Sequence, residues 1–406
     1  MSYVKCLTCK QCNNQYPIDP INVCELCFGP LEVSYDYEKI SRSVTRSSIS
    51  NGPLNIWRYH QFLPVSLENA IDIGTGFTPL IHAKNLGALL GLKNLYIKND
   101  SVNPSYSFKD RPVAVTTAKA LEFDFKILAC VSTGNLMGSV GAHAAKAKMK
   151  SYVFFPKGLE KGKIIGSSIY GARLISVDGN YDEVNRLCSE LADNFKWAFV
   201  NINMRAYYAE GSKTLGFEVA EQLNWKAPAH CVVPAASGEL HTKIWKGLME
   251  MKDVGLIEKV NTKMHLAQPE GCSPIVKAFN NKETQVTPIK PNTIAKSLAI
   301  GNPASGPFAL KTLKDSSGSA IAAPEEEISE CIQLLAETEG IFTETAGGVV
   351  ISSLRSLVKK NKINSEDITV AFITGNGLKT QEIVEDTVEY DEIKPTYKSF
   401  EEIIKI

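Results

Sequence analysis

The chain has 406 residues, which is enough for two or three domains, and its 44% hydrophobic and 22% charged content is that of an ordinary soluble protein. Lys plus Arg and Asp plus Glu number 44 each, so the zero net charge gives no sign of a nucleic-acid or anionic-membrane partner. No signal-peptide segment and no apolar run of membrane-spanning length is present, so we expect a cytoplasmic protein whose ten cysteines are thiols or metal ligands.

Five of the ten cysteines lie within the first 27 residues. Two Cys-x2-Cys pairs, separated by eleven residues, have the spacing of a zinc ribbon, in which four thiolates surround the ion tetrahedrally and leave no open position for a substrate. We therefore predict a zinc-ribbon-like module at residues 1–36 with a structural Zn²⁺ bound by Cys9, Cys12, Cys24 and Cys27. Cys6 overlaps the first pair and could replace Cys9. The alternative is a loop of five reduced thiols.

Residues 37–70 are polar, with a Ser- and Arg-rich stretch at 41–50, and predict an irregular linker around the main body. From about residue 73, short apolar runs alternate with amphipathic stretches, which indicates a mainly parallel α/β architecture. The runs predicted as strands are Leu95–Ile97, Ile127–Val131, Ser151–Phe155, Ala172–Val177, Ala198–Ile202, Cys231–Val233, Met264–Ala267 and Thr369–Thr374.

One helix is predicted in detail, because proline and three acids open it at residues 324–327 and Gly340 follows its end. Its apolar stripe is formed by Ile328, Ile332, Leu335 and Ala336. The predicted domain division places the linker and the start of the large domain at residues 37–100. A small α/β domain follows at 101–218, the rest of the large α/β domain at 219–390, and a C-terminal tail at 391–406.

Lys109 lies in the string from Asn103 to Arg111 (NPSYSFKDR), between a predicted strand and a predicted helix at residues 114–121. A lysine at such a junction can act as an amine nucleophile and form a Schiff base with a carbonyl cofactor, above all pyridoxal phosphate. The alternative is a surface helix lysine. The neighbouring Phe108 and the pair Asp110-Arg111 disfavour it.

Three further strings follow predicted strands, where sites in parallel sheets are expected. The string Ser132-Thr133-Gly134-Asn135 could bind a carboxylate or phosphate at a helix N-terminus, or serve only as a helix cap. Residues 234–240 (PAASGEL) are either a phosphate-binding loop or a plain tight turn. Thr374 opens TGNG, and its hydroxyl would leave a facing pyridine nitrogen neutral.

Asn201 and Arg205 also follow a predicted strand and are candidates for binding a phosphate group. For Arg205 an ordinary surface charge is an equally good interpretation. For Lys213, a little further along, surface charge is the better one. The six histidines are dispersed without metal-ligand spacing, so we interpret them as structural.

Together these strings resemble the fold type II pyridoxal-phosphate enzymes, and most closely the threonine synthase family. The resemblance extends over nearly the whole chain. Its strings are Cys27 to Leu31 (CFGPL), Gly76 to Leu80 (GFTPL), Asn103 to Arg111, Ser132 to Asn135, Glu210 to Thr214 (EGSKT), Ile294 to Pro303, Glu344 to Gly348 (ETAGG) and Thr374 to Lys379 (TGNGLK).

The resemblance implies a tryptophan synthase β-like fold with two open, twisted, mostly parallel sheets covered by helices. It implies that Lys109 forms the Schiff base beside Phe108, that Asn135 bonds the cofactor's ring oxygen and that Thr374 faces its ring nitrogen. The cofactor phosphate would be bound by Ala236, Ser237, Gly238, Glu239 and Leu240. The substrate carboxylate would be bound by Ser132 and Thr133, and the substrate phosphate by Asn201 and Arg205.

Three positions depart from the family pattern. The phosphate loop carries Glu239, whose carboxylate would repel a phosphate, so we expect this side chain to point away. Tyr106 and Leu136 stand where relatives have smaller or hydroxyl residues, which bears on substrate positioning.

The activity implied is the lyase reaction of O-phospho-L-homoserine and water to L-threonine and phosphate, the last step of threonine biosynthesis, by an enzyme expected to be a homodimer. The alternatives are a relative that uses another phosphorylated amino acid, such as cysteate synthase, and threonine dehydratase, which Asn201 and Arg205 disfavour. A retired enzyme that acts as a binding or regulatory protein is a further alternative.

Overall fold

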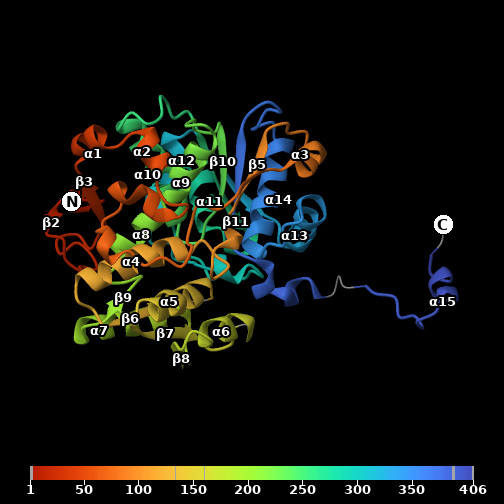
Figure 1. Ribbon diagram of the computed structural model, residues 1–406, viewed down its shortest axis with the longest axis horizontal. Coiled ribbons are helices and arrows are strands. Elements are labelled where there is room, and N and C mark those ends of the chain that lie inside the picture. The colour runs from red at the N-terminus through yellow and green to blue at the C-terminus, as the bar shows by residue number, and fades with distance from the viewer. Residues whose placement is uncertain (1–2, 133, 160, 386–388, 405–406) are drawn as a thin grey trace.

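The computed structural model describes residues 3–132, 134–159, 161–385 and 389–404. The N-terminal module is a three-stranded antiparallel sheet in the order β2-β1-β3, which lies at one side of the molecule (Figure 1). Its strands are β1 (Val4–Cys9), β2 (Gln15–Tyr16) and β3 (Leu31–Tyr35). The inward positions of β3 alternate with half-buried ones, so one face of the small sheet packs against the body.

Residues 37–70 are not irregular, and that prediction was wrong. They form four short helical segments, namely α1 (Tyr37–Ser43), α2 (Arg46–Ser50) and the 3₁₀ helices η1 (Ile56–Phe62) and η2 (Leu67–Asn69). Side-chain caps start two of them: Asp36 accepts the Lys39 N–H, and Thr45 and Ser48 form a capping box. Each segment has at most seven residues, too few for the helical period to stand out in the sequence.

A four-stranded, fully parallel sheet has the order β8-β7-β6-β9. Helices accompany it on both faces, as the right-handed parallel connections require (Figure 1). Its strands are β6 (Ile127–Val131), β7 (Lys150–Pro156), β8 (Arg173–Val177) and β9 (Ala198–Phe199), and its helices are α4 (Asp110–Glu122), α5 (Asn135–Lys146), α6 (Lys161–Ser168) and α7 (Tyr181–Asn194).

A six-stranded sheet has the order β12-β11-β10-β13-β5-β4, parallel except for the edge strand β4. Every residue of β10 and β13 is buried, as in a sheet covered on both faces. Its strands are β4 (Leu80–His82), β5 (Leu95–Asn99), β10 (His230–Pro234), β11 (Lys263–Pro269), β12 (Ala320–Ala323) and β13 (Thr369–Ile373).

Further helices cover this sheet or pack on the helices that do, and the predicted helix is confirmed as α13, which ends at a left-handed Gly340. The helices are α3 (Lys84–Leu90), α8 (Arg205–Gly211), α9 (Thr214–Gln222), α10 (Glu239–Asp253), α11 (Pro274–Asn280), α12 (Gly306–Asp315), α13 (Glu325–Glu339) and α14 (Thr345–Lys359). Short 3₁₀ turns are η3 (Asp100–Val102), η4 (Glu270–Cys272), η5 (Lys296–Leu298), η6 (Gly377–Lys379) and η7 (Gln381–Ile383), and α15 (Tyr397–Glu401) lies apart from the body (Figure 1).

The predicted fold class is confirmed: two mostly parallel sheets covered by helices, with a cysteine-rich module compatible with a zinc ribbon. All eight predicted strands exist. The bounds of β4 and β12 were not predicted, because β4 has only three residues and β12 has a single isoleucine among alanines, which is a weak strand signal. The division of the chain into domains stays a prediction. No helix among the described residues is both long and apolar enough to cross a bilayer.

Candidate active site

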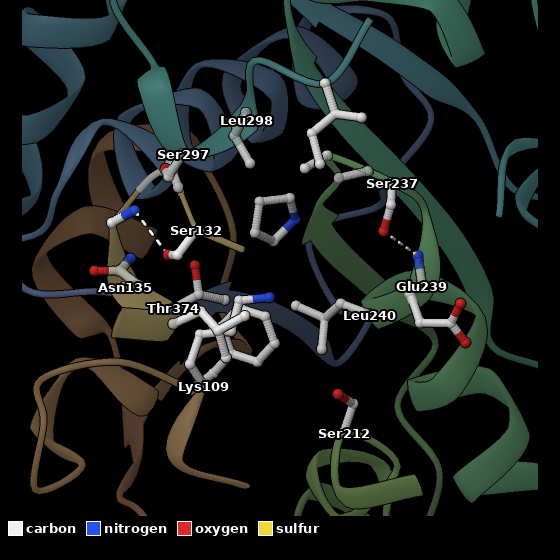
Figure 2. A pocket seen from close by; sticks show the side chains of 18 of the residues that line it. Lys109, Ser132, Asn135, Ser212, Ser237, Glu239, Leu240, Ser297, Leu298 and Thr374 are labelled. Carbon is white, nitrogen blue, oxygen red and sulfur yellow. Dashed lines mark hydrogen bonds between the residues drawn. The ribbon is translucent and has the colours of Figure 1, made fainter. Parts of the chain in front are cut away.

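Loops from the carboxyl ends of four parallel strands meet around one cavity of about 150 Å³. They follow β5, β6, β10 and β13, and they bring together Lys109, Asn135, the loop at residues 236–240 and Thr374. In Figure 2 the Lys109 amine lies near the centre of this cavity, beside Thr374 and Leu240. Phe108 and Ser132 line it too. Thr133, which we predicted beside Ser132, lies outside the described residues.

The loop that carries Lys109 is anchored by the two residues that follow it. The Asp110 carboxylate accepts hydrogen bonds from the backbone N–H and the hydroxyl of Ser105, at 2.7 and 2.5 Å. The Arg111 guanidinium, fully buried, pairs with Asp100 on one side and Glu218 on the other. A buried cation with two carboxylate partners holds the start of α4 in one place. The sequence Lys-Asp-Arg therefore combines one reactive side chain with two structural ones.

The same loop is paired with the loop after β13. The Phe108 N–H donates to the Thr374 carbonyl oxygen at 2.9 Å, and Ser107 forms an isolated antiparallel bridge with Gly375. A Cβ on Gly375 would lie 2.2 Å from the Glu344 carboxylate, so only glycine fits at this position. Backbone hydrogen bonds thus set the spacing between Lys109 and Thr374.

Lys109 lies among aromatic groups rather than carboxylates. Its Nζ donates to the Tyr208 hydroxyl at 3.0 Å and lies 4.6 Å from the centre of the Phe108 ring. Burial lowers the pKa of Lys109 to about 8, and the more distant Glu344 and Glu239 oppose this only in part. A substantial fraction of the amine is therefore neutral near neutral pH and able to act as a nucleophile or base.

Asn135 lies at the first position of α5, between an acid and a second lysine. Its amide nitrogen donates to both Glu344 carboxylate oxygens, at 2.8 and 2.9 Å, and its amide oxygen accepts from Lys379 Nζ at 3.1 Å. Burial lowers the pKa of Lys379 to about 8. The amide nitrogen carries two hydrogens, so Asn135 can keep one bond to Glu344 and offer the other to a ring oxygen.

The loop after β10 approaches the cavity with its backbone. Gly238 has a φ of +87°, and a Cβ there would lie 2.9 Å from Ala309, so a side chain is excluded. The first backbone N–H groups of the 15-residue α10 follow this loop. A helix N-terminus with such free N–H groups favours binding of an anion. Ser297 lines the opposite wall, and its Oγ is buried without a hydrogen-bond partner in the described part of the chain. These features fit a phosphorylated ligand.

Glu239 does not point at this anion position. Its carboxylate accepts a short hydrogen bond from the Ser305 hydroxyl and lies 3.6 Å from Arg205, and Figure 2 shows it turned away from Lys109. Of the two departures near the substrate, Leu136 is buried against the cavity, whereas Tyr106 is about half exposed with a φ of +60°.

A second cavity of about 400 Å³ adjoins the first and shares Lys109 and Tyr208 with it. The two residues predicted to bind the substrate phosphate, Asn201 and Arg205, line it. The Asn201 amide is already engaged at both ends by the backbone of Val131, at 3.2 and 3.1 Å. Arg205 donates from one guanidinium nitrogen to the Ser305 hydroxyl at 3.3 Å and lies 3.6 Å from Glu239, and its guanidinium carries further N–H donors for a phosphate. The prediction of a surface position for Lys213 was wrong, because this lysine is fully buried between Glu210 and Glu250.

The four predicted metal ligands come together. The Sγ atoms of Cys9, Cys12, Cys24 and Cys27 all lie within 4.8 Å of one another. The Cys9–Cys27 and Cys12–Cys24 separations are 3.5 and 3.6 Å, and tetrahedral zinc with bonds of about 2.3 Å requires about 3.8 Å. Cys6 is not part of this group; its Sγ lies 3.6 Å from Thr8. A four-thiolate zinc site fits this geometry.

Several residues of the site had no predicted role, and the polar ones that the structure places beside Lys109 and Asn135 or in the cavity wall include Tyr208, Ser297, Glu344 and Lys379. Ser297, Glu344 and Lys379 lie in strings that carried the family resemblance, so their positions in those strings were the available signal. Tyr208 had none: an aromatic residue on a short helix is usually a core residue.

The sequence and fold were compared with known proteins. The chain is 38% identical over 375 residues to threonine synthase of Methanocaldococcus jannaschii, covering 91% of this chain and 92% of that protein. It is 36% identical to threonine synthase of Methanosarcina acetivorans, covering 94% of each. A family model described as "Pyridoxal-phosphate dependent enzyme" matches residues 71–375. The chain belongs to the threonine synthase family of pyridoxal-phosphate dependent enzymes.

Solved structures support the fold alone. Diaminopropionate ammonia lyase from Escherichia coli superimposes with a TM-score of 0.67 at 18% identity, covering 84% of this chain and 91% of that one. Maize serine racemase superimposes with a TM-score of 0.65 at 16% identity, covering 80% and 98%. The resemblance predicted from the sequence is confirmed at the level of fold type and family.

Proposed function

We propose that this threonine synthase family member converts O-phospho-L-homoserine and water to L-threonine and phosphate in the cavity around Lys109. The observation that carries the proposal is the meeting of Lys109, Asn135, the 236–240 loop and Thr374 from four strand ends. Relatives at 36–38% identity over nearly the whole chain are threonine synthases, which supports the reaction.

Bound pyridoxal phosphate would supply an electron sink for the bonds at the substrate's α carbon. Lys109 would hold its aldehyde carbon, and Asn135 its ring oxygen. The backbone N–H groups of residues 236–240 would hold its phosphate. Thr374 would face the ring nitrogen, and Phe108 would flank the ring. Because the side chain of Thr374 ends in a hydroxyl and not a carboxylate, it would not stabilise a protonated ring nitrogen.

Lys109 would remove and return the proton at the α carbon once the substrate amine has displaced it. This requires a neutral amine, and burial lowers its pKa far enough for that. The Tyr208 hydroxyl, 3.0 Å from Nζ, would hold the free lysine in place between its two tasks. The surrounding rings of Phe108 and Tyr208 exclude water from the amine and add no counter-charge that would favour its protonated form.

Ser132 and Thr133, with the N-terminus of α5, would bind the substrate carboxylate. The second cavity would receive the phosphate of the substrate, where Arg205 offers a planar pair of donors. Asn201 stays a weaker candidate because Val131 occupies its amide.

We also infer that a structural Zn²⁺ joins the four cysteines, supported by their sulfur separations and by Gly29. A Cβ on Gly29 would lie 3.0 Å from Cys9 Sγ and 3.2 Å from Cys27 Sγ, so a side chain there would press on two of the four sulfurs. The homodimer, the cytoplasmic location and the division of the chain after residues 36, 100, 218 and 390 remain predictions.

Steady-state product analysis tests the function. The purified holoenzyme should release phosphate and threonine in equal amounts from O-phospho-L-homoserine. Phosphoserine with sulfite should give no comparable phosphate release. The opposite preference would assign the chain to a cysteate synthase activity, and a cofactor absorption band near about 410–420 nm without turnover on either substrate would indicate a binding protein.

A further inference from the structure

The N-terminal cysteine module reaches the second cavity. Asn22 and Val23 line it together with Lys109, Arg205 and other residues of the main body. These two residues directly precede the ligand Cys24, and Val23 forms an antiparallel bridge with Pro30. Their position therefore depends on the fold of the knuckle that the cysteines form.

Ion pairs hold the N-terminal module against α10, the helix that begins at the loop of residues 236–240. Glu32 on β3 accepts from Lys243 on α10 at 2.5 Å and lies 3.3 Å from Lys246. Lys243 also contacts Glu210 on α8 at 2.6 Å, and both side chains are almost completely buried. Breaking a buried ion-pair network has a large unfavourable free energy, so the module, α8 and α10 are held together as one unit.

Further contacts join the module to elements around the second cavity. Tyr207 on α8 donates to the Asp19 carbonyl oxygen at 2.9 Å, one helical position before Tyr208. Lys10 lies 4.2 Å from the centre of the Phe308 ring on α12, the helix that packs against Gly238. Lys10 also helps to lower the pKa of Glu239, against the opposing effect of burial. The module thus contacts the elements around the second cavity, and its Lys10 acts electrostatically on Glu239 in the cavity wall.

We propose that the metal-ordered module forms the outer wall of the substrate cavity and supplies Asn22 as a substrate-positioning residue at the phosphate end. The proposal rests on the function proposed above. The Asn22 amide carries both a donor and an acceptor and no charge, which suits a phosphate oxygen or a water bound to it. The module's role is then to hold substrate, and the cofactor is held by the main body.

Asn22→Asp tests this, because it places a negative charge at nearly constant volume beside the substrate phosphate. In the holoenzyme we expect KM for O-phosphohomoserine and Ki for inorganic phosphate to rise at least about tenfold, with kcat within about threefold. The visible cofactor band should be unchanged. Gln15→Glu makes the same amide-to-carboxylate change at an exposed position of β2, away from the cavity, and should leave all these values unchanged.

Asn22→Ala serves as a second variant that adds no charge, with an expected rise of about threefold in KM. If KM and phosphate Ki of both variants stay within about twofold of the parent, the proposal is overturned while the proposed function stands. A parent enzyme that does not turn over O-phosphohomoserine would instead overturn the function.

Removal of the metal by a chelator gives a readout that does not depend on a side chain at the cavity. The expected result is a loss of zinc by metal analysis and a rise in KM and phosphate Ki, with the visible cofactor band retained. An unchanged KM after zinc loss, or loss of the cofactor band in step with zinc, would contradict the assignment of the module to the substrate.

Discussion

The molecule buries lysines in two neighbouring regions and uses them in opposite ways. At the active site, the nearest hydrogen-bond partner of Lys109 is a neutral hydroxyl, and burial lowers its pKa to about 8. Between the module and α10, burial would also lower the pKa of Lys243, but Glu210 and Glu32 at 2.6 and 2.5 Å outweigh burial and raise it. Two carboxylates within bonding distance keep Lys243 a structural cation, and the lack of a carboxylate among the hydrogen-bond partners of Lys109 leaves its amine reactive.

The largest expected effect follows from removing the reactive lysine. Lys109→Ala should abolish the visible band of the lysine-bound cofactor and reduce kcat by at least about 10³-fold, because both the anchor and the base are lost. Absorbance spectra and phosphate release measure this. The Lys243→Met variant should instead be less stable, and its folded fraction should still show the visible cofactor band. Normal turnover by Lys109→Ala would refute the assignment of the site.

The structural lysines can be tested through their shared carboxylate. Glu210→Gln leaves Lys243, Lys213 and Lys246 short of a buried counter-charge and should lower the free energy of unfolding by about 3–5 kcal/mol. Denaturant unfolding provides the measurement. Glu366→Gln, which breaks an exposed pair with Lys93, is the matched control and should change nothing measurable. Equal stability of the two variants would contradict the contrast between the regions.

Tyr208→Phe removes the hydroxyl that holds the Lys109 amine and leaves the ring. We expect kcat to fall about tenfold with a smaller change in KM, because the free lysine is less well placed for proton transfer. Steady-state kinetics measures the fall in kcat. The visible band should also return more slowly after the substrate is consumed. A KM effect alone would mean that Tyr208 contacts only the substrate.

A graded effect of pH on cofactor binding is expected without any substitution. Lys109 attacks the cofactor aldehyde as a neutral amine, so below pH 8 the rate of cofactor binding to the apoenzyme should rise about tenfold per pH unit. Above about pH 8 the rate should level off, whereas a lysine with its ordinary pKa of 10.5 would show a rise that continues. Glu344 raises this pKa, so Glu344→Gln should move the break to lower pH, with Glu239 and the neutral Tyr208 still facing the amine. Absorbance-monitored reconstitution gives the profile, and a flat profile from pH 6 to 9 would contradict the lowered pKa.

The parts of the site that lie on strand ends were predictable from the sequence. Lys109, Ser132, Ser237 and Thr374 each follow an apolar run, and parallel strands bring their carboxyl ends to one edge. The cysteine pairs were predictable too, because their spacing is short and local. These predictions needed only the local pattern and one rule of topology.

The rest depended on contacts between segments far apart in the chain. Glu344 meets Asn135 across 209 positions, and Tyr208 meets Lys109 across 99. The helices at residues 37–62 were missed because each has at most seven residues, which is too short for the helical period to stand out. Occupation of the Asn201 amide by the Val131 backbone could not be seen either. Such pairings are set by tertiary packing, which local patterns do not encode.

The pairing of the Lys109 loop with the Thr374 loop has a consequence for how this chain can vary. The Phe108 N–H and the Thr374 carbonyl join the two loops by main-chain atoms, and Gly375 is the position in this pairing that excludes a side chain. Substitutions at the other side chains around the cavity therefore leave the spacing between Lys109 and Thr374 in place. A single inserted or deleted residue in either loop would shift both groups at once. These two loops can therefore vary in their side chains but not in their number of residues.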